Sequence, residues 1–162
     1  MVRRLAVLWG LSGLLIASVR PEKADRIVIL KSQRQMVLRS HGKVLRTYRV
    51  SLGRNPIGPK TRQGDLRTPE GLYVIDGRYP RNEYHMALHI SYPNAADRAR
   101  ASKLGVAPGG DILIHGLPVA KNSPEKADPA ENWTKGCVAV RDKEIEEIYQ
   151  MVPDGTVVEI RP

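Results

Sequence analysis

Phenylalanine is absent from this 162-residue sequence, and cysteine occurs once, as Cys137. Without phenylalanine, the core has to be filled by tyrosine, tryptophan, leucine, isoleucine and valine. With a single cysteine, no disulfide can form within the chain. The composition, 41% hydrophobic and 27% charged, is ordinary for a soluble globular protein, and the length suits one domain with one core.

Acidic residues are also scarce, with 17 against 26 basic residues and a formal net charge of +9. Such an excess favours anionic partners: nucleic acid, an acidic membrane surface or a polyanionic cell wall. The basic residues are scattered, and no zinc-finger pattern, RNP-like motif or basic heptad region occurs, so we expect no nucleic-acid partner. Four histidines without a clustered His/carboxylate pattern predict no metal, and we expect no cofactor.

The N-terminus indicates export. Arg3 and Arg4 precede an uncharged run, residues 5–19, which has the length of a signal-peptide apolar region and is short for a membrane span. The alternative is a buried helix. We expect residues 1–20 to be a signal peptide or a short membrane tether, residues 21–162 to form the folded domain, and the protein to lie in the periplasm or cell envelope. In an oxidising compartment, an unpaired Cys137 is either buried and inert or kept free for its thiolate.

Short apolar runs punctuated by turn residues predict a mainly β fold, a single twisted sandwich or barrel-like sheet. The expected strands are residues 27–30, 36–38, 44–50, 71–75, 87–91, 111–115, 137–140 and 156–160. Asn94 is expected to cap a helix through about Leu104, with Gly105 ending it. Asp142 is expected to cap a second helix with one apolar face, formed by Ile145, Ile148, Tyr149 and Val152. A long Gly/Pro/Lys-rich loop, residues 53–69, is typical of a functional loop.

Two strand edges carry reactive side chains next to glycines: His115 before Gly116, and Cys137 after Gly136. Cysteine catalysis needs a thiolate, a nearby base and backbone N–H groups aimed at the developing oxyanion. Gly136 would let the backbone approach a substrate carbonyl, and an inward-pointing Lys135 would favour the thiolate. The structural alternatives are a cysteine that fills the core and a histidine that is hydrogen-bonded in place.

The stretch from Arg26 to Ile160 resembles the L,D-transpeptidase catalytic domain, or YkuD-like family. The resemblance rests on the order and spacing of three segments, Arg67–Tyr73 (RTPEGLY), Ile114–Gly116 (IHG) and Thr134–Val140 (TKGCVAV). The segments Ser91–Arg98 and Trp133–Thr134 resemble the YafK-like, murein-modifying branch. Two positions depart from most members, which have histidine where this chain has Lys135 and often arginine where it has Ala139.

The resemblance implies a β-sandwich-like catalytic domain of the L,D-transpeptidase type over residues 21–162, with Cys137 as nucleophile, His115 as base and the Gly116 carbonyl orienting the imidazole. The thiolate would attack the third residue of a peptidoglycan stem peptide, a diamino acid, and leave a thioester. An amine acceptor, from another stem or an envelope lipoprotein, would complete transpeptidation. Water would instead make the protein a carboxypeptidase or a crosslink hydrolase, and the sequence leaves these outcomes open.

Further side chains are candidates for substrate contact near the same groove: Tyr84, Tyr92, Trp133, Thr134 and Lys135. For His85 and His89, alternation along a strand is a sufficient explanation. Two rival functions need no chemistry: a cell-wall binding module, and a structural protein tethered by residues 5–19. Neither of these functions explains why a His-Gly and a Gly-Cys strand edge occur in one chain. We expect the protein to be a monomer.

Overall fold

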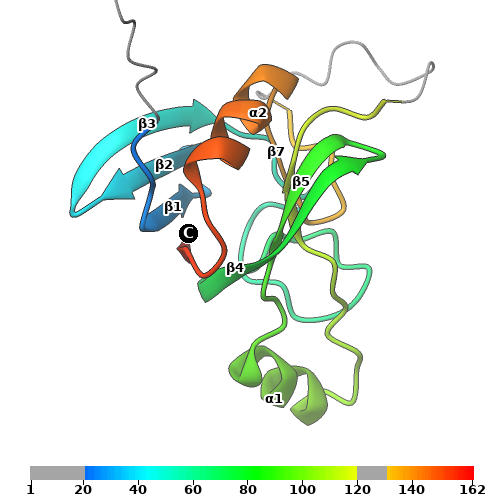
Figure 1. Cartoon of the computed structure of the whole chain (residues 1–162). Coiled ribbons are helices and arrows are strands. Elements are labelled where there is room, and N and C mark those ends of the chain that lie inside the picture. The colour runs from blue at the N-terminus through cyan, green and yellow to red at the C-terminus, as the bar shows by residue number, and fades with distance from the viewer. Residues whose placement is uncertain (1–20, 120–130) are drawn as a thin grey trace, which may run out of the picture.

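The computed structural model of the protein describes residues 21–119 and 131–162 (Figure 1). The expected signal peptide or tether, residues 1–20, lies outside the described residues. Of the helices that are described, none has both the length and the apolar character needed to cross a membrane.

One curled sheet of eight strands forms the body of the domain, in the spatial order β3-β2-β1-β8-β4-β5-β6-β7 (Figure 1). The pairs β1–β2, β2–β3, β4–β5, β5–β6 and β4–β8 are antiparallel, whereas β1–β8 and β6–β7 are parallel. The strands are β1 (Arg26–Leu30), β2 (Gln35–Ser40), β3 (Lys43–Arg49), β4 (Gly71–Asn82), β5 (His85–Ile90), β6 (Leu113–His115), β7 (Val138–Ala139) and β8 (Val157–Arg161). The predicted mainly β, barrel-like class with two short helices is confirmed.

Strand β4 joins the two halves of the sheet. Its first part pairs with β8, and its second part, from Ile75 onward, pairs with β5. The sequence predicted a strand that ends at Ile75, but β4 continues to Asn82. Gly77 and Pro80 weaken the strand pattern there, and the structure accommodates the extension with register shifts between Ile75 and Gly77 and between Tyr79 and Asn82. The bent β4–β5 hairpin ends beside the candidate site.

The two helices lie at opposite ends of the view in Figure 1. Helix α1 (Ala95–Lys103) begins after Asn94, whose side chain accepts the Asp97 N–H at 3.0 Å, as the sequence predicted. Helix α2 (Asp142–Met151) begins one residue earlier than expected: Arg141 is its N-cap, and Asp142 is its first helical residue. The Asp142 carboxylate is therefore free to accept a hydrogen bond from outside the helix.

The core lies between α2 and the inner face of the sheet. Helix α2 contributes a buried apolar face and packs against β5 and β6. Isoleucine, leucine and valine dominate this core, with tyrosine in place of phenylalanine, as the composition requires. Its fully buried large side chains are Ile27, Ile29, Met36, Leu38, Leu52, Ile75, Leu88, Ile90, Ile114, Ile145 and Ile148. His115 is equally buried but lies outside this apolar cluster, and a fully buried histidine is the first structural sign of a site.

Candidate active site

Parallel pairing of β6 with β7 brings His115 and Cys137 onto one face of the sheet. Ile114 pairs with Val138 and His115 with Ala139, so the same register places Cys137 beside Leu113. Side chains alternate along a strand, and Ile114 and Val138 point into the core. His115 and Cys137 therefore project to the opposite face, two positions apart along the strands.

A single tautomer is fixed for His115 by its surroundings. Its Nδ1 lies 2.7 Å from the Gly116 carbonyl oxygen, which can only accept, so Nδ1 carries the proton. Burial lowers the pKa of His115 to about 4, against the opposing effect of the Gly116 hydrogen bond. The ring is consequently neutral at physiological pH, and Nε2 presents a lone pair that can take a proton.

Two aromatic side chains enclose the His115 ring. The Tyr84 ring, from the β4–β5 turn, lies with its centroid 4.3 Å from that of His115, and the Trp133 ring packs edge-on at 5.8 Å. The Trp133 indole N–H is buried and has no hydrogen-bond partner among the described residues. Tyr84 and Trp133, both expected near the groove, are thus placed against the candidate base. They restrict the imidazole to one orientation and keep water from its faces.

Helix α2 holds the segment that follows His115. The Asp142 Oδ1 accepts the Leu117 N–H at 2.8 Å, and the Gly116 N–H donates to the backbone oxygens of Tyr84 and Met86. A Cβ on Gly116 would lie 2.6 Å from Asp142 Oδ1, so a larger residue would displace the carboxylate that accepts the Leu117 N–H. Asp142 thereby fixes the carbonyl that orients His115. The sequence suggested only a capping role for this residue.

Cys137 follows a tight turn that is closed by Thr134. The Thr134 hydroxyl donates to the Cys137 carbonyl oxygen at 2.7 Å and accepts the Gly136 N–H at 3.1 Å. The buried Thr134 side chain is thus used within the turn, rather than facing a substrate. Gly136 has φ +139°, and a Cβ there would meet the Arg67 carbonyl oxygen at 2.7 Å. Its close approach is to the loop of residues 53–69, where the sequence suggested an approach to substrate.

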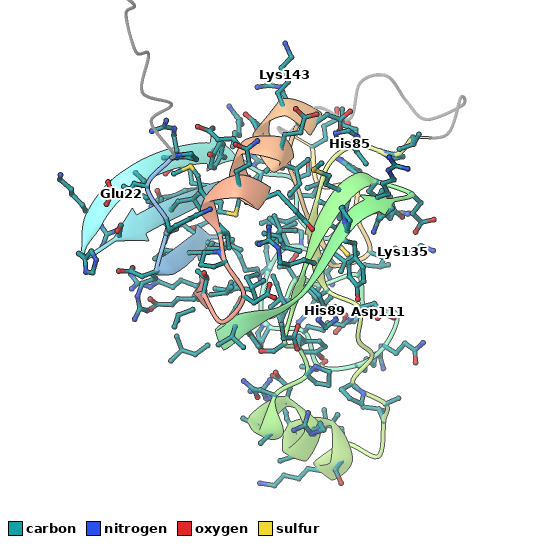
Figure 2. The ribbon with its side chains drawn as sticks, in the orientation of Figure 1. Glu22, His85, His89, Asp111, Lys135 and Lys143 are labelled. Carbon is teal, nitrogen blue, oxygen red and sulfur yellow. The ribbon has the colours of Figure 1, made fainter. Side chains whose placement is uncertain are left out.

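The Cys137 side chain is half-buried. Cys137 Sγ lies 3.5 Å from the Asp111 carbonyl oxygen, and burial raises its pKa, with the Asp111 charge adding to the effect. The sequence favoured a thiolate at Cys137, whereas burial in the fold raises the thiol pKa and favours the neutral thiol. Lys135 is exposed and points outward at the edge of the molecule (Figure 2). The lysine whose charge reaches the thiol, and acts to lower its pKa, is Lys60.

A cavity of about 290 Å³ opens next to Cys137. It lies where the loop of residues 53–69 meets the segment before β6, and its lining consists of Lys60, Gln63, Gly64, Leu66, Gly109, Gly110, Asp111, Ile112, Lys135 and Cys137. The two segments are joined by a hydrogen bond from the Gln63 N–H to the Ala107 carbonyl oxygen at 2.8 Å. The two segments that line the cavity are therefore held together by the backbone.

Ionic contacts stabilise the loop that forms one wall of the cavity. Lys60 Nζ lies 2.8 Å from Asp65 Oδ1, with both side chains almost fully buried. Burial acts to raise the pKa of Asp65, but hydrogen bonds from Lys60 and from the backbone N–H groups of Thr61, Arg62 and Arg67 hold it below its ordinary value. The loop is thus a fixed wall behind Gly136.

The remaining candidates lie away from the cavity. Tyr92 belongs to the core, where its ring packs edge-on against Tyr73 at 6.0 Å and its hydroxyl donates to the Pro108 carbonyl oxygen at 2.9 Å. His85 and His89 pair with the carboxylates of Glu146 and Asp76 at 2.8 and 2.5 Å. Within residues 21–119 and 131–162, no group of three or more His, Cys, Asp or Glu side chains is placed to hold a metal ion.

Sequence reasoning missed three residues around the site. Lys60 and Asp111 line the cavity, and Asp142 holds the segment after His115. A lysine in a polar loop and an aspartate before a strand carry no local signal of burial or of proximity to a cysteine far along the chain. Only Asp142 had a local signal, its place at a helix start, and that signal indicated a cap.

A curled β domain, with a histidine that ends one strand and a cysteine directly before the neighbouring parallel strand, defines the class of protein. Residues 24–160 match the YkuD family, described as the L,D-transpeptidase catalytic domain. The chain belongs to this family. It is 32% identical over 116 residues to YafK of Escherichia coli K12, whose name places it provisionally among the L,D-transpeptidases. That match covers 70% of this chain and 39% of YafK, so the chain spans about two fifths of that relative.

Solved structures show the same fold. The helical cell shape determining protein Pgp2 of Campylobacter jejuni superposes with a TM-score of 0.62 at 25% identity, over 86% of this chain and 48% of Pgp2. An L,D-transpeptidase from Mycobacterium smegmatis gives 0.57 at 16% identity, over 86% of this chain and 59% of that one. Bd1075 of Bdellovibrio bacteriovorus gives 0.57 at 22% identity, over 90% and 50%.

Proposed function

We propose that this protein is a cysteine acyltransferase of the cell envelope that acts on peptidoglycan stem peptides as an L,D-transpeptidase. The observation that carries the proposal is the shared face of β6 and β7, on which a neutral His115 with a free Nε2 lies near the only thiol of the chain. Family membership supports the substrate class, and the apolar run of residues 5–19 supports export.

The proposed reaction begins with a neutral pair, the Cys137 thiol and the uncharged His115 imidazole. The thiol proton of Cys137 passes to His115 Nε2 as the sulfur attacks the carbonyl carbon of the third stem residue, a diamino acid, and forms a C–S bond. The Cys137 N–H is the donor we assign to the oxyanion, because the Gly136 N–H is already donated to Thr134. The C–N bond then breaks, and His115 returns the proton to the departing amine.

A thioester on Cys137 is the intermediate. An acceptor amine, from another stem peptide or an envelope lipoprotein, attacks it, loses a proton to His115 and releases the sulfur. Attack by water instead gives a free tripeptide or cleaves an existing crosslink. These outcomes use the same side chains, so they are distinguished by product analysis.

The proposal is tested by incubating the purified protein with disaccharide-tetrapeptide and analysing products by mass spectrometry. We expect loss of the terminal D-alanine with a crosslinked dimer, and a mass on the wild-type protein that matches the thioester. Cys137→Ser retains the shape of the side chain and should lose the thioester. His115→Gln should lower kcat/KM by about 10²–10⁴-fold, the usual contribution of a general base.

A free tripeptide without a dimer would reassign the protein as a carboxypeptidase. If tetrapeptide stays intact, crosslinked and lipoprotein-linked muropeptides are offered next. No turnover of any of these substrates by the wild type would refute the enzyme and leave a cell-wall binding module, whereas equal turnover by Cys137→Ser would refute Cys137 as the nucleophile.

A further inference from the structure

Strands β3, β2, β1, β8 and the first part of β4 form one half of the sheet, and this half has a face outside the core. Side chains alternate along a strand, so Ile27 and Ile29 of β1 belong to the core cluster, whereas Val28 lies outside it. Helix α2 lies on the inward side, where the Tyr48 hydroxyl donates to Glu147 at 2.8 Å. We call the opposite side the outer face, and the strand register places on it Arg26, Arg39, Arg49, Arg161, Leu72 and Val74.

Arginine gives the outer face its charge. Arg26 lies directly opposite Arg39 across the antiparallel β1–β2 pair, and β3 and β8 add Arg49 and Arg161. At the described positions of this face, the one carboxylate is that of Glu159, which pairs with Arg26 at 3.1 Å and with Arg161 at 2.8 Å. Four arginines against one carboxylate leave the outer face with a charge of +3.

Two of these arginines have no carboxylate partner within residues 21–119 and 131–162. They are Arg39 and Arg49, whereas Arg26 shares Glu159. Like charges that face each other on neighbouring strands destabilise a sheet, and Arg39 faces Arg26. An anion above this pair would relieve the repulsion. The outer face is therefore complementary to a negatively charged surface.

Apolar side chains are exposed on the same face. Leu72 is 61% exposed and Val74 is 37% exposed, both at outward positions of β4, and Val74 lies beside Val157 of β8. A lipid bilayer takes up apolar side chains in its interfacial region and cations at its headgroups, whereas a soluble polyanion takes up only the cations. A second copy of the chain would bring two faces of +3 together, which charge repulsion opposes.

The apolar N-terminal run lies close to this face along the chain. Residues 5–19 end seven positions before β1 begins at Arg26. Seven residues span at most about 25 Å when fully extended. A bilayer that held residues 5–19 would therefore lie within about 25 Å of β1, a strand of the outer face.

We propose that the outer face docks the domain on an anionic lipid bilayer, with its arginines on the headgroup phosphates and Leu72 and Val74 in the interfacial region. Each part of the face then has a partner: the unpaired guanidinium groups meet anions, and the exposed apolar side chains leave water. Strands β6 and β7, which hold the candidate active site, lie at the other end of the sheet order from β3. The docked face therefore does not include the candidate active site.

The experiment compares the binding of the full chain to vesicles of phosphatidylcholine and to vesicles of equal parts phosphatidylcholine and phosphatidylglycerol, by co-sedimentation. The ratio of the two affinities isolates the contribution of lipid charge, because residues 5–19 are present in both measurements. Arg39→Gln combined with Arg49→Gln should lower the affinity for the anionic vesicles about 30-fold, since each arginine near such a surface contributes about fivefold.

Lys103→Gln combined with Lys143→Gln is the matched control. It removes the same charge from exposed positions on α1 and α2, away from the outer face, and Figure 2 shows Lys143 on α2. Its affinity for the anionic vesicles should stay near that of the wild type. An equal loss in the two double variants, or equal affinity of the wild type for both kinds of vesicle, would overturn the inference.

Leu72→Ser distinguishes a bilayer from other partners. It should lower the affinity for anionic vesicles about fivefold, the effect of burying part of one leucine side chain, and leave binding to long-chain polyphosphate unchanged. Polyphosphate binding as tight as vesicle binding, with no effect of Leu72→Ser on either, would assign the face to a soluble polyanion and refute the membrane inference. A wild-type dimer that Leu72→Ser abolishes would assign the face to a second copy and refute it as well. Thermal unfolding verifies that each variant is folded, and Arg39→Gln alone, with about a fivefold loss expected, tests the inference should the double variant unfold.

Discussion

Replacing Gly136 by alanine tests whether the loop of residues 53–69 positions the nucleophile. The new Cβ would lie 2.7 Å from the Arg67 carbonyl oxygen, about 0.7 Å inside ordinary contact at 3.4 Å, and φ is +139°. Backbone strain of this kind costs about 1–3 kcal/mol, and overpacking against fixed atoms costs a similar amount. We expect a loss of about 2–6 kcal/mol in the free energy of unfolding, measured with urea.

Turnover should fall as well, because relief of the contact has to move either Arg67 or the turn that holds Cys137. A displacement near 1 Å costs about a hundredfold in rate. Gly42→Ala is the matched control: Gly42 also has positive φ, +80°, but a Cβ there meets nothing within 4 Å. It should lose about 1–2 kcal/mol and keep full turnover. Equal stability of the two variants, with equal turnover, would refute the reasoning.

Three further changes probe the neutral pair and its supports. Because burial raises the pKa of Cys137, its alkylation by iodoacetamide should be slow at pH 7 and still accelerate above pH 9.0, the ordinary thiol value; a plateau below neutrality would contradict this. Asp142→Ala should lower kcat more than it changes KM, since the His115 orientation depends on the segment that Asp142 holds; an unchanged kcat would remove its positioning role. Asp65 has a folded pKa below its ordinary 3.8, so it stabilises the fold above that pH. The stability lost in Asp65→Asn, from urea unfolding, should therefore shrink as pH falls below about 4, and a loss that is constant with pH would argue against it.

Much of the fold could be predicted from the sequence because its signals are local. The Asn94 side chain caps α1 within one turn of chain, and apolar alternation marks most of the strands. The extension of β4 could not be predicted, because Gly77 and Pro80 disfavour a strand, and pairing with β5 compensates only in the folded protein. Helix α2 likewise begins one residue before the start that Asp142 suggested, and the Asp142 carboxylate accepts the distant Leu117 N–H instead of capping the helix.

The candidate pair, His115 and Cys137, could be predicted from the sequence, because a histidine and a cysteine next to glycines at strand edges indicate possible chemistry by themselves. Which lysine lies near the thiol was decided by tertiary structure alone. Lys135 is adjacent to the motif yet points to solvent, whereas Lys60, 77 positions before Cys137, is buried beside it. The raised pKa of the Cys137 thiol is likewise a property of its burial. Sequence thus determined which groups can react, and packing between distant segments determined their charge states and their neighbours, because desolvation and Coulomb interactions depend on distance in space.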